Sequence, residues 1–192
     1  MLFSMYKNLQ GKTTMKLLFF SDVHGVPQAL EKLLAHADTM HPDRLVLLGD
    51  ALYHGPRNGV PAVYDPKLVA DLLNQNSRRI LAVRGNCDAE VDQMMLNFPI
   101  MADYSEILTD TARFFLTHGH HWNADHLPPL PPGSILVHGH THLPVLQKVE
   151  DDITIFNPGS ISLPKGGNPP TFGWFDGKEL SLRLLETGEI FS

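Results

Sequence analysis

The run Leu45-Val46-Leu47-Leu48-Gly49-Asp50 is the most informative segment for predicting the fold. An apolar run that ends at a glycine fits a strand buried on both faces, as in a parallel or mixed sheet covered by helices. Gly49 lets the backbone turn, and Asp50 follows where the strand becomes a loop. Ligands bind at this carboxyl end of the strands in open α/β sheets. Gly-Asp after an apolar run is also an ordinary turn, so the neighbouring strand ends must decide.

Other apolar runs end in the same way. Leu17 to Phe20 reads as a strand followed by Asp22 and His24, and Arg79 to Val83 as a strand followed by Gly85-Asn86-Cys87-Asp88. In an extended segment, side chains two apart share a face, so Asp22 and His24 could reach one metal ion. A helix-capping Asp and an exposed His are the alternative.

Histidines mark two more strand ends. The chain has 11 histidines, and seven of them fall between His118 and His142. Arg113 to Leu116 leads into His118-Gly119-His120, and Ser134 to Val137 leads into His138-Gly139-His140-Thr141-His142. Two such clusters at strand ends indicate a metal site, because histidine is the commonest metal ligand among side chains.

The rest of the pattern predicts an α/β fold in one domain. Ala29 to Ala37 and Asp65 to Asn76 read as amphipathic helices, and Val91 to Leu96 as a short one. Residues 122–133, with several prolines, read as a loop. After Pro144 the pattern changes to short strands, which we expect to form a second sheet packed on the first. They are Val145 to Val149, Thr154 to Phe156, Thr171 to Phe175 and Leu180 to Leu184, with hairpin turns at Asp151-Asp152 and Asp176-Gly177.

Length and composition limit the alternatives. The 192 residues are 43% hydrophobic, which suits a single domain with a sizeable core. Residues 15–192 are expected to form that domain. Residues 1–14 are expected to be an N-terminal extension, either a short disordered arm or the result of a misassigned start, with Met15 or Met5 as the true one. They do not have the pattern of a secretory signal.

Charge and cysteine content exclude further classes. The net charge is -6, so we expect no stable nucleic-acid complex, although a nucleotide could be a substrate if bound metals supply positive charge. No apolar run approaches the roughly 18 residues of a membrane helix, so no membrane partner is expected. The single cysteine, Cys87, fits a reducing cytoplasm.

Read together, Asp22-x-His24, Gly49-Asp50, Gly85-Asn86-x-Asp88, His118 and Gly139-His140-x-His142 resemble the calcineurin-like metallophosphoesterase superfamily. The ordered pattern covers nearly the whole chain after Met15 and is most similar to the small YfcE-type bacterial phosphodiesterases. The resemblance implies a two-sheet β-sandwich flanked by helices, an αββα four-layer arrangement, with a dinuclear metal centre at the sheet edge.

The same resemblance implies a ligand set. One ion would bind Asp22, His24, Asp50 and His142, and the other Asp50, Asn86, His118 and His140. Asp50 would bridge the two ions at roughly 3.5–4 Å, and a hydroxide held between them would attack phosphorus. Mixed O and N ligands permit Fe, Zn, Ni or Co, with Mn the expected metal.

The sequence offers several candidate residues for substrate contacts and for the general acid. His54 and Arg57, in the loop after Asp50, could donate to phosphate oxygens or be solvated loop residues. Many family members have histidine after the motif asparagine as the leaving-group acid, whereas this chain has Cys87. Cys87 could be a weak acid or a packing residue; His54 or His120 could replace it, and Asp88 could orient a neighbour.

These patterns predict a metal-dependent phosphodiesterase acting on a small or nucleotide-like diester. A phosphomonoesterase with the same site is the alternative within enzymes. A non-catalytic scaffold of the same fold is the other, although such scaffolds typically lose histidines that are all present here. The expected partner is a small phosphoester, and a homo-oligomer is compatible with the sequence.

Overall fold

The structure is a computed structural model that describes residues 14–192, so the extension expected over residues 1–14 lies outside the described residues except for Thr14. In the described part, the elements are β1 (Leu17–Phe20), α1 (Pro27–Met40), β2 (Arg44–Leu47), α2 (Pro66–Gln75), β3 (Ile80–Ala82), α3 (Glu90–Met95), β4 (Tyr104–Leu108), β5 (Arg113–Thr117), β6 (Ile135–Val137), β7 (Pro144–Lys148), β8 (Thr154–Pro158), β9 (Thr171–Phe175) and β10 (Leu180–Leu184).

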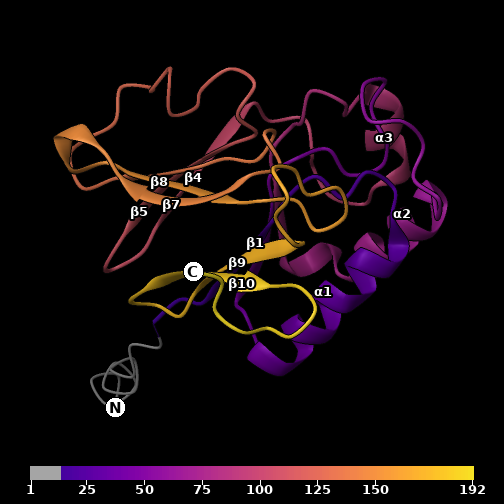
Figure 1. Ribbon diagram of the computed structural model, residues 1–192, viewed down its shortest axis with the longest axis horizontal. Coiled ribbons are helices and arrows are strands. Elements are labelled where there is room, and N and C mark those ends of the chain that lie inside the picture. Colours follow the sequence, from indigo (N-terminus) through magenta and orange to yellow (C-terminus); the bar gives the residue numbers. More distant parts are fainter. Residues whose placement is uncertain (1–13) are drawn as a thin grey trace, which may run out of the picture.

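The strands form two five-stranded mixed sheets packed face to face (Figure 1). The first sheet has the order β10-β9-β1-β2-β3, in which β1, β2 and β3 are parallel and β9 and β10 antiparallel. The second has the order β4-β5-β6-β8-β7, with β5, β6 and β8 parallel. The parallel strands β1, β2 and β3 of the first sheet and β5 and β6 of the second lead into the polar loops.

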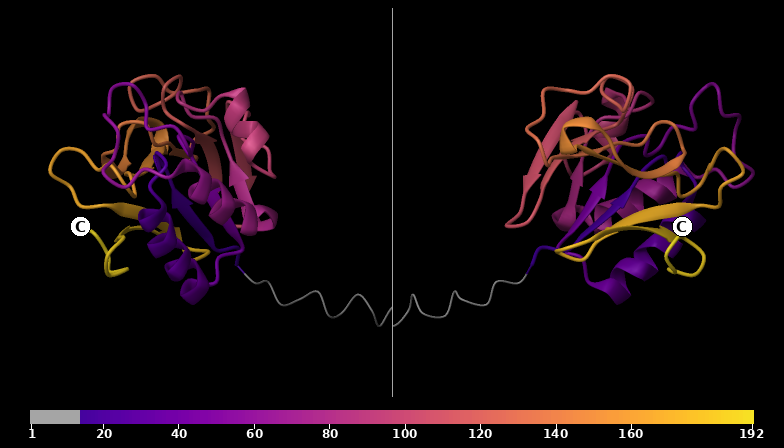
Figure 2. Two further views of the ribbon diagram at one scale, coloured as in Figure 1. Left: turned by 90° about the vertical axis from the view of Figure 1, so that its right-hand side faces the viewer. Right: turned by 60° about the vertical axis from the view of Figure 1, so that its left-hand side comes forward.

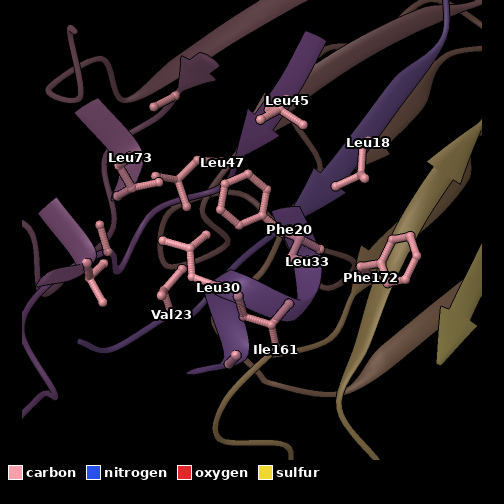
Figure 3. Close-up of a cluster of buried hydrophobic side chains, with 14 of the residues drawn as sticks. Leu18, Phe20, Val23, Leu30, Leu33, Leu45, Leu47, Leu73, Ile161 and Phe172 are labelled. Atoms are coloured by element: carbon pink, nitrogen blue, oxygen red, sulfur yellow. The ribbon is translucent and has the colours of Figure 1, made fainter. Parts of the chain in front are cut away.

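Strand β1 shows why the central strands are apolar throughout. Leu18 and Phe20 pack with helix α1 residues such as Leu30 and Leu33 (Figure 3). Their neighbours Leu17 and Phe19 join a different cluster, between the two sheets. The ring of Phe19 lies 5.6 Å from that of Phe156 in β8, edge to face. Since strand side chains alternate, a strand between a helix layer and a second sheet must be apolar at every position.

Helices cover only the first sheet. Helices α1 and α2 contribute buried residues to the cluster on its outer face, and Figure 2 shows α1 on the side away from the second sheet. The outer face of the second sheet, which includes Phe115 and Leu136, is packed by Trp122 and Leu130 from the loop over residues 118–133. The predicted two-sheet sandwich with flanking helices is confirmed, with a loop as the outermost layer on one side.

The predicted composition of the second sheet was wrong. Only β7 and β8 of the four C-terminal strands belong to it, while β9 and β10 return to the first sheet beside β1. Strands β5 and β6 belong to the second sheet, and β4 was not predicted at all. Strand β4 forms one edge of that sheet, and most of its side chains are partly or fully exposed. Its sequence, Tyr-Ser-Glu-Ile-Leu, therefore lacks the apolar run of a central strand.

Most other boundaries agree within a few residues. Helix α1 is longer than predicted, beginning at Pro27 and ending at Met40. Helix α2 begins after Asp65, whose carboxylate accepts a hydrogen bond from Leu68 N at 2.9 Å. Both predicted hairpin turns are present, joining β7 to β8 and β9 to β10. Among the described residues, none of the helices has the length and apolar character needed to cross a bilayer.

Candidate metal centre

The carboxyl ends of β1, β2, β3, β5 and β6 meet at one edge of the sandwich. Beyond the strands, the loops bond to each other directly: Asp22 N donates to Gly49 O at 3.1 Å, and Gly139 N to His118 O at 2.8 Å. The loops of the two sheets also bond to each other: His140 N, after β6, donates to the Asp22 Oδ2 atom, after β1, at 3.1 Å. The five polar loops are therefore held as one unit.

The backbone of these loops is unusual. Eight described non-glycine residues have positive φ, and five of them are predicted metal ligands, namely Asp22, His24, Asp50, His140 and His142. A left-handed residue other than glycine costs roughly 1–2 kcal/mol. The side chains two apart do converge, but the predicted reason was wrong, because these segments are tight left-handed turns rather than extended strand ends. Backbone strain of this kind clusters at functional sites.

Three predicted ligands converge at one side of the centre. His142 Nε2 lies 3.2 Å from Asp22 Oδ1, and His24 Nε2 lies 3.6 Å from the same oxygen. The Asp50 Oδ2 atom lies 3.7 Å from His24 Nε2. These three side chains and that of Asp50 are buried, and Asp22, His24 and His142 each present one possible ligand atom to a common point. They are three of the four side chains proposed for the first ion.

The remaining ligands converge on the other side of Asp50. His118 Nε2 lies 3.5 Å from Asp50 Oδ2 and 3.0 Å from Asn86 Oδ1. The Nδ1 atom of His140 is 3.3 Å from the same His118 nitrogen. Oδ2 of Asp50 thus lies between His24 and His118, while its Oδ1 accepts a hydrogen bond from Cys87 N at 2.8 Å. A single carboxylate faces both groups of ligands, as a bridge requires.

Hydrogen bonds to the backbone determine which imidazole nitrogens are free. His24 Nδ1 donates to Tyr53 O at 2.8 Å, and His142 Nδ1 to Leu163 O at 2.6 Å. Neutral rings held this way carry no proton on Nε2. Their two Nε2 atoms nevertheless face each other at 3.3 Å. Two lone pairs directed at one another need a cation between them, and imidazoles that ligate metals are commonly oriented by such backbone acceptors.

The second group has the same chemistry. His118 Nδ1 donates to Leu48 O at 2.6 Å, which directs its Nε2 atom at the Oδ1 atom of Asn86, 3.0 Å away. The Oδ1 atom of Asp22 is buried and has no hydrogen-bond partner among the described residues. A buried carboxylate oxygen without a donor is costly. These orphaned atoms fit a pair of divalent cations.

Charge coupling in the cluster favours the ionised forms. Burial alone would raise the pKa of Asp22, but the neighbouring imidazoles of His142 and His24 hold it well below its usual range. Burial would likewise lower the pKa of His118, yet the neighbouring Asp50 carboxylate raises it to about 9. A cation that binds at His118 must therefore displace a proton, so metal binding releases protons.

Asp88 holds the turn that contains Asp50. Its carboxylate accepts three backbone N–H bonds, from Asp50 at 2.9 Å, Ala51 at 3.0 Å and Gly85 at 2.7 Å. An additional Cβ at Gly85 would overlap the Asp50 carboxylate, so only glycine lets the loops after β2 and β3 approach this closely. Asp88 is therefore a positioning residue.

Cys87 lies beside Asp50. Its thiol is half-buried, and one of its contacts is a bond accepted from Asn86 Nδ2 at 3.2 Å. Burial, followed by the nearby Asp50 carboxylate, raises the pKa of this thiol to about 12. A thiol with such a pKa is protonated at neutral pH and is a weaker acid than an imidazolium.

An open cleft of about 350 Å³ gives access to the centre. Asp50, Asn86, His140 and His142 line it, together with exposed Arg57 and with Lys165 from the loop after β8. Arg57 thus lines the same cleft as four of the predicted ligands. His54 is not among the lining residues; its ring packs against Tyr53 and Tyr64.

His120 lies behind the second group of ligands. Its ring centre is 5.4 Å from that of His118, and its Nδ1 atom is buried with no partner among the described residues. Burial and the neighbouring histidines lower its pKa to about 4. The neutral ring is a poor proton donor at neutral pH.

Sequence reasoning did not assign a role to three polar residues that support the ligand loops. Asn157 Nδ2 donates to Gly139 O at 2.9 Å and to Thr141 Oγ1 at 3.0 Å. Ser160 and Ser162 both donate from Oγ to Asp22 O at 2.8 Å. Asn157 and Ser160 belong to the stretch Asn157-Pro158-Gly159-Ser160. Its polar residues directly after a buried strand were the available signal.

The chain is similar to known proteins over most of its length. The model of the calcineurin-like phosphoesterase superfamily domain matches residues 15–179. Phosphodiesterase YfcE of Escherichia coli strain K12 is 48% identical over 178 residues, covering 93% of this chain and 96% of that protein. The solved structure of the E. coli phosphoesterase YfcE has a TM-score of 0.90 at 47% identity, covering 93% of this chain and 97% of that one.

A more distant likeness shows the fold alone. Vps29 from Entamoeba histolytica, solved in complex with Zn²⁺, has a TM-score of 0.57 at 19% identity, covering 92% of this chain and 96% of that one. The family model and the close relatives, in contrast, extend over most of the described domain. The chain belongs to the calcineurin-like phosphoesterase superfamily and is a hydrolase of phosphoric esters.

Proposed function

We propose that the chain is a metal-dependent phosphodiesterase that hydrolyses a small or nucleotide-like phosphodiester at a dinuclear centre. The observation that carries this proposal is the position of Asp50, whose Oδ2 atom lies 3.7 Å from His24 Nε2 and 3.5 Å from His118 Nε2. The relatives at 48% identity are named phosphodiesterases, which supports the diester as substrate.

The seven side chains divide into two ligand sets that share Asp50. Asp22, His24 and His142 would complete the first set, and Asn86, His118 and His140 the second. Four imidazoles, two carboxylates and one amide permit Mn, Fe, Zn, Ni or Co, and Mn is the metal we propose. Two divalent ions against two carboxylates leave the centre cationic, so an acidic protein can still attract a phosphate ester.

When bound, the ions would polarise the phosphoryl oxygens and supply an activated water. The chain's own residues do the rest. Arg57 and Lys165 line the open side of the cleft and would draw the anionic diester toward the ligands. Asp88 keeps the turn at Asp50 in place through its three backbone bonds. Correct placement of reacting groups is itself a large part of catalysis.

The side chains near the cleft favour substrates with good leaving groups. A thiol protonates a departing alkoxide less readily than an imidazolium does, and Cys87 is the residue directly after Asn86. His120 is neutral at pH 7, and His54 packs between two tyrosines away from the cleft lining. We therefore propose that the enzyme prefers stabilised leaving groups over simple alkoxides. A cytoplasmic location stays a prediction from the single cysteine.

The test is a hydrolysis assay with bis-p-nitrophenyl phosphate. Purified protein should turn over this diester with added Mn²⁺, lose activity to a chelator and regain it when Mn²⁺ is restored. Comparison of kcat/KM with p-nitrophenyl phosphate distinguishes diester from monoester hydrolysis, and a clear monoester preference would replace the proposed reaction. Protein that binds Mn²⁺ yet stays inert with both substrates would be a scaffold.

A further inference from the structure

A second hollow adjoins the cleft and differs from it in chemistry. We call it the apolar pocket; its walls include Tyr53, Tyr64, Cys87, Ala89, Val91 and Met95. Its volume is about 370 Å³, within the range of roughly 300–1,000 Å³ that is common for small-molecule sites. Tyr53, Cys87 and Ala89 line both hollows, so the pocket lies directly beside the metal cleft.

The pocket presents aromatic and aliphatic surface to water. Tyr53 is 40% exposed, Val91 63% and Met95 45%. The ring of His54 lies 4.6 Å from that of Tyr53 and 5.3 Å from that of Tyr64, centre to centre. His54 thus packs with both tyrosines and fixes their rings. Apolar surface left exposed beside an active-site cleft is a usual mark of a binding surface.

The charges on the two hollows differ. Besides the metal ligands, the charged side chains that line the cleft are the cations Arg57 and Lys165. The apolar pocket has one residue of each sign, Lys67 and Asp92. The Asp92 carboxylate accepts a hydrogen bond from Ala89 N at 2.7 Å. The cleft therefore suits a phosphate, and the pocket suits an uncharged ring.

We propose that the apolar pocket binds one ester substituent of the diester, an aryl ring or a single nucleobase, while the cleft binds its phosphate. This rests on the proposed function, because the phosphate must occupy the metal cleft. Aromatic side chains bind flat rings by stacking and by burial of apolar area. His54 then acts as a positioning residue for the tyrosines rather than as a donor to phosphate.

The test compares the binding of two probes to Mn²⁺-loaded protein by calorimetry, namely phenyl phosphate and inorganic phosphate. The unaltered protein should bind phenyl phosphate about tenfold more tightly. Val91→Asp should bring the ratio of the two dissociation constants to about one. Met94→Asp is the matched control, since Met94 lies on the same helix, is 85% exposed and does not line the pocket. The new charge affects both phosphates, so the ratio isolates the ring.

The outcomes separate the two proposals. Phosphate binding and diester hydrolysis without any preference for phenyl phosphate would overturn the pocket alone. A preference that survives Val91→Asp would do the same. Absence of phosphate binding together with absence of hydrolysis would remove the proposed function and the pocket with it. Light scattering that shows self-association lost only in Val91→Asp would assign this surface to contact between copies of the chain.

Discussion

The ligand loops and the cleft wall meet at the same opening but are built in different ways. Five of the seven ligands, all except Asn86 and His140, are buried, with exposures between 0 and 2%. Arg57 and Lys165 on the wall have exposed side chains and come from the loops that follow Asp50 and β8. Metal binding therefore depends on strained, hydrogen-bonded turns. Substrate affinity depends instead on exposed side chains such as Arg57 and Lys165.

The largest effect should follow from Asp50→Asn. Asparagine keeps the acceptor for Cys87 N but places an uncharged amide between His24 and His118, which damages both ligand sets. Activity should fall about 1,000-fold or more, equivalent to roughly 4 kcal/mol of transition-state stabilisation. The measurements are kcat/KM on bis-p-nitrophenyl phosphate and Mn²⁺ bound per chain.

Asp38→Asn is the control for Asp50→Asn. Asp38 is an exposed carboxylate in an ion pair with Arg79, at 3.2 Å, on the helix-covered side of the molecule. Its loss should leave activity and Mn²⁺ content unchanged, because exposed pairs contribute little. Full Mn²⁺ occupancy in Asp50→Asn would show that residue 50 is not the shared ligand.

A smaller loss should follow from Asp88→Asn. The asparagine amide would face a backbone N–H with a donor of its own, so one of the three bonds from the Asp50, Ala51 and Gly85 amides is lost. Changes in groups that orient metal ligands typically cost about 10- to 100-fold in metal affinity or activity. Calorimetric titration with Mn²⁺ should show this weakening, whereas Asp65→Asn, at the start of α2, should not. Unchanged Mn²⁺ affinity would reduce Asp88 to a packing role.

The central strands and the residue types at their ends could be predicted because they follow from simple periodicity. β1 is apolar at every position and β2 at every position after Arg44, and only a few arrangements bury both faces of a strand. The identities of Asp22 and His24 also suggested ligands. Their left-handed backbone could not be predicted, because it depends on bonds such as Ser160 Oγ to Asp22 O, made by a residue 138 positions away.

Edge strands and surfaces escaped prediction for a different reason. β4 has an exposed face and no apolar run, so its pairing with β5 is decided by the partner strand rather than by its own sequence. The apolar pocket combines Tyr53 and Tyr64 with Val91 and Met95, from loop and helix segments that the sequence gives no reason to pair. Properties that depend on such long-range contacts need coordinates.

Arg57→Ala tests how much an exposed side chain on the cleft wall contributes to substrate affinity. The loss of one cation near the ligands should raise KM for the diester about fivefold to tenfold, or roughly 1 kcal/mol, with little change in kcat. Arg78→Ala removes the same charge at an exposed site outside the cleft and is the control. Added salt should weaken the difference, because exposed charges are screened. A tenfold fall in kcat with unchanged KM would place Arg57 in the chemical step instead.

The smallest effect is expected from Cys87→Ala, although Cys87 lies next to the bridging carboxylate. The bond to Asp50 Oδ1 comes from the backbone N–H of residue 87, which alanine retains. The thiol itself, with its pKa raised to about 12, contributes little as an acid. Turnover of bis-p-nitrophenyl phosphate should therefore stay within about threefold of the unaltered protein, because such a change is below roughly 1 kcal/mol. A diester with an alkyl leaving group gives the more sensitive assay, since its hydrolysis depends most on proton donation. If Cys87→Ala abolished only that reaction, the thiol would be the general acid. Residue 87 would then belong with the ligand loops rather than with the cleft wall.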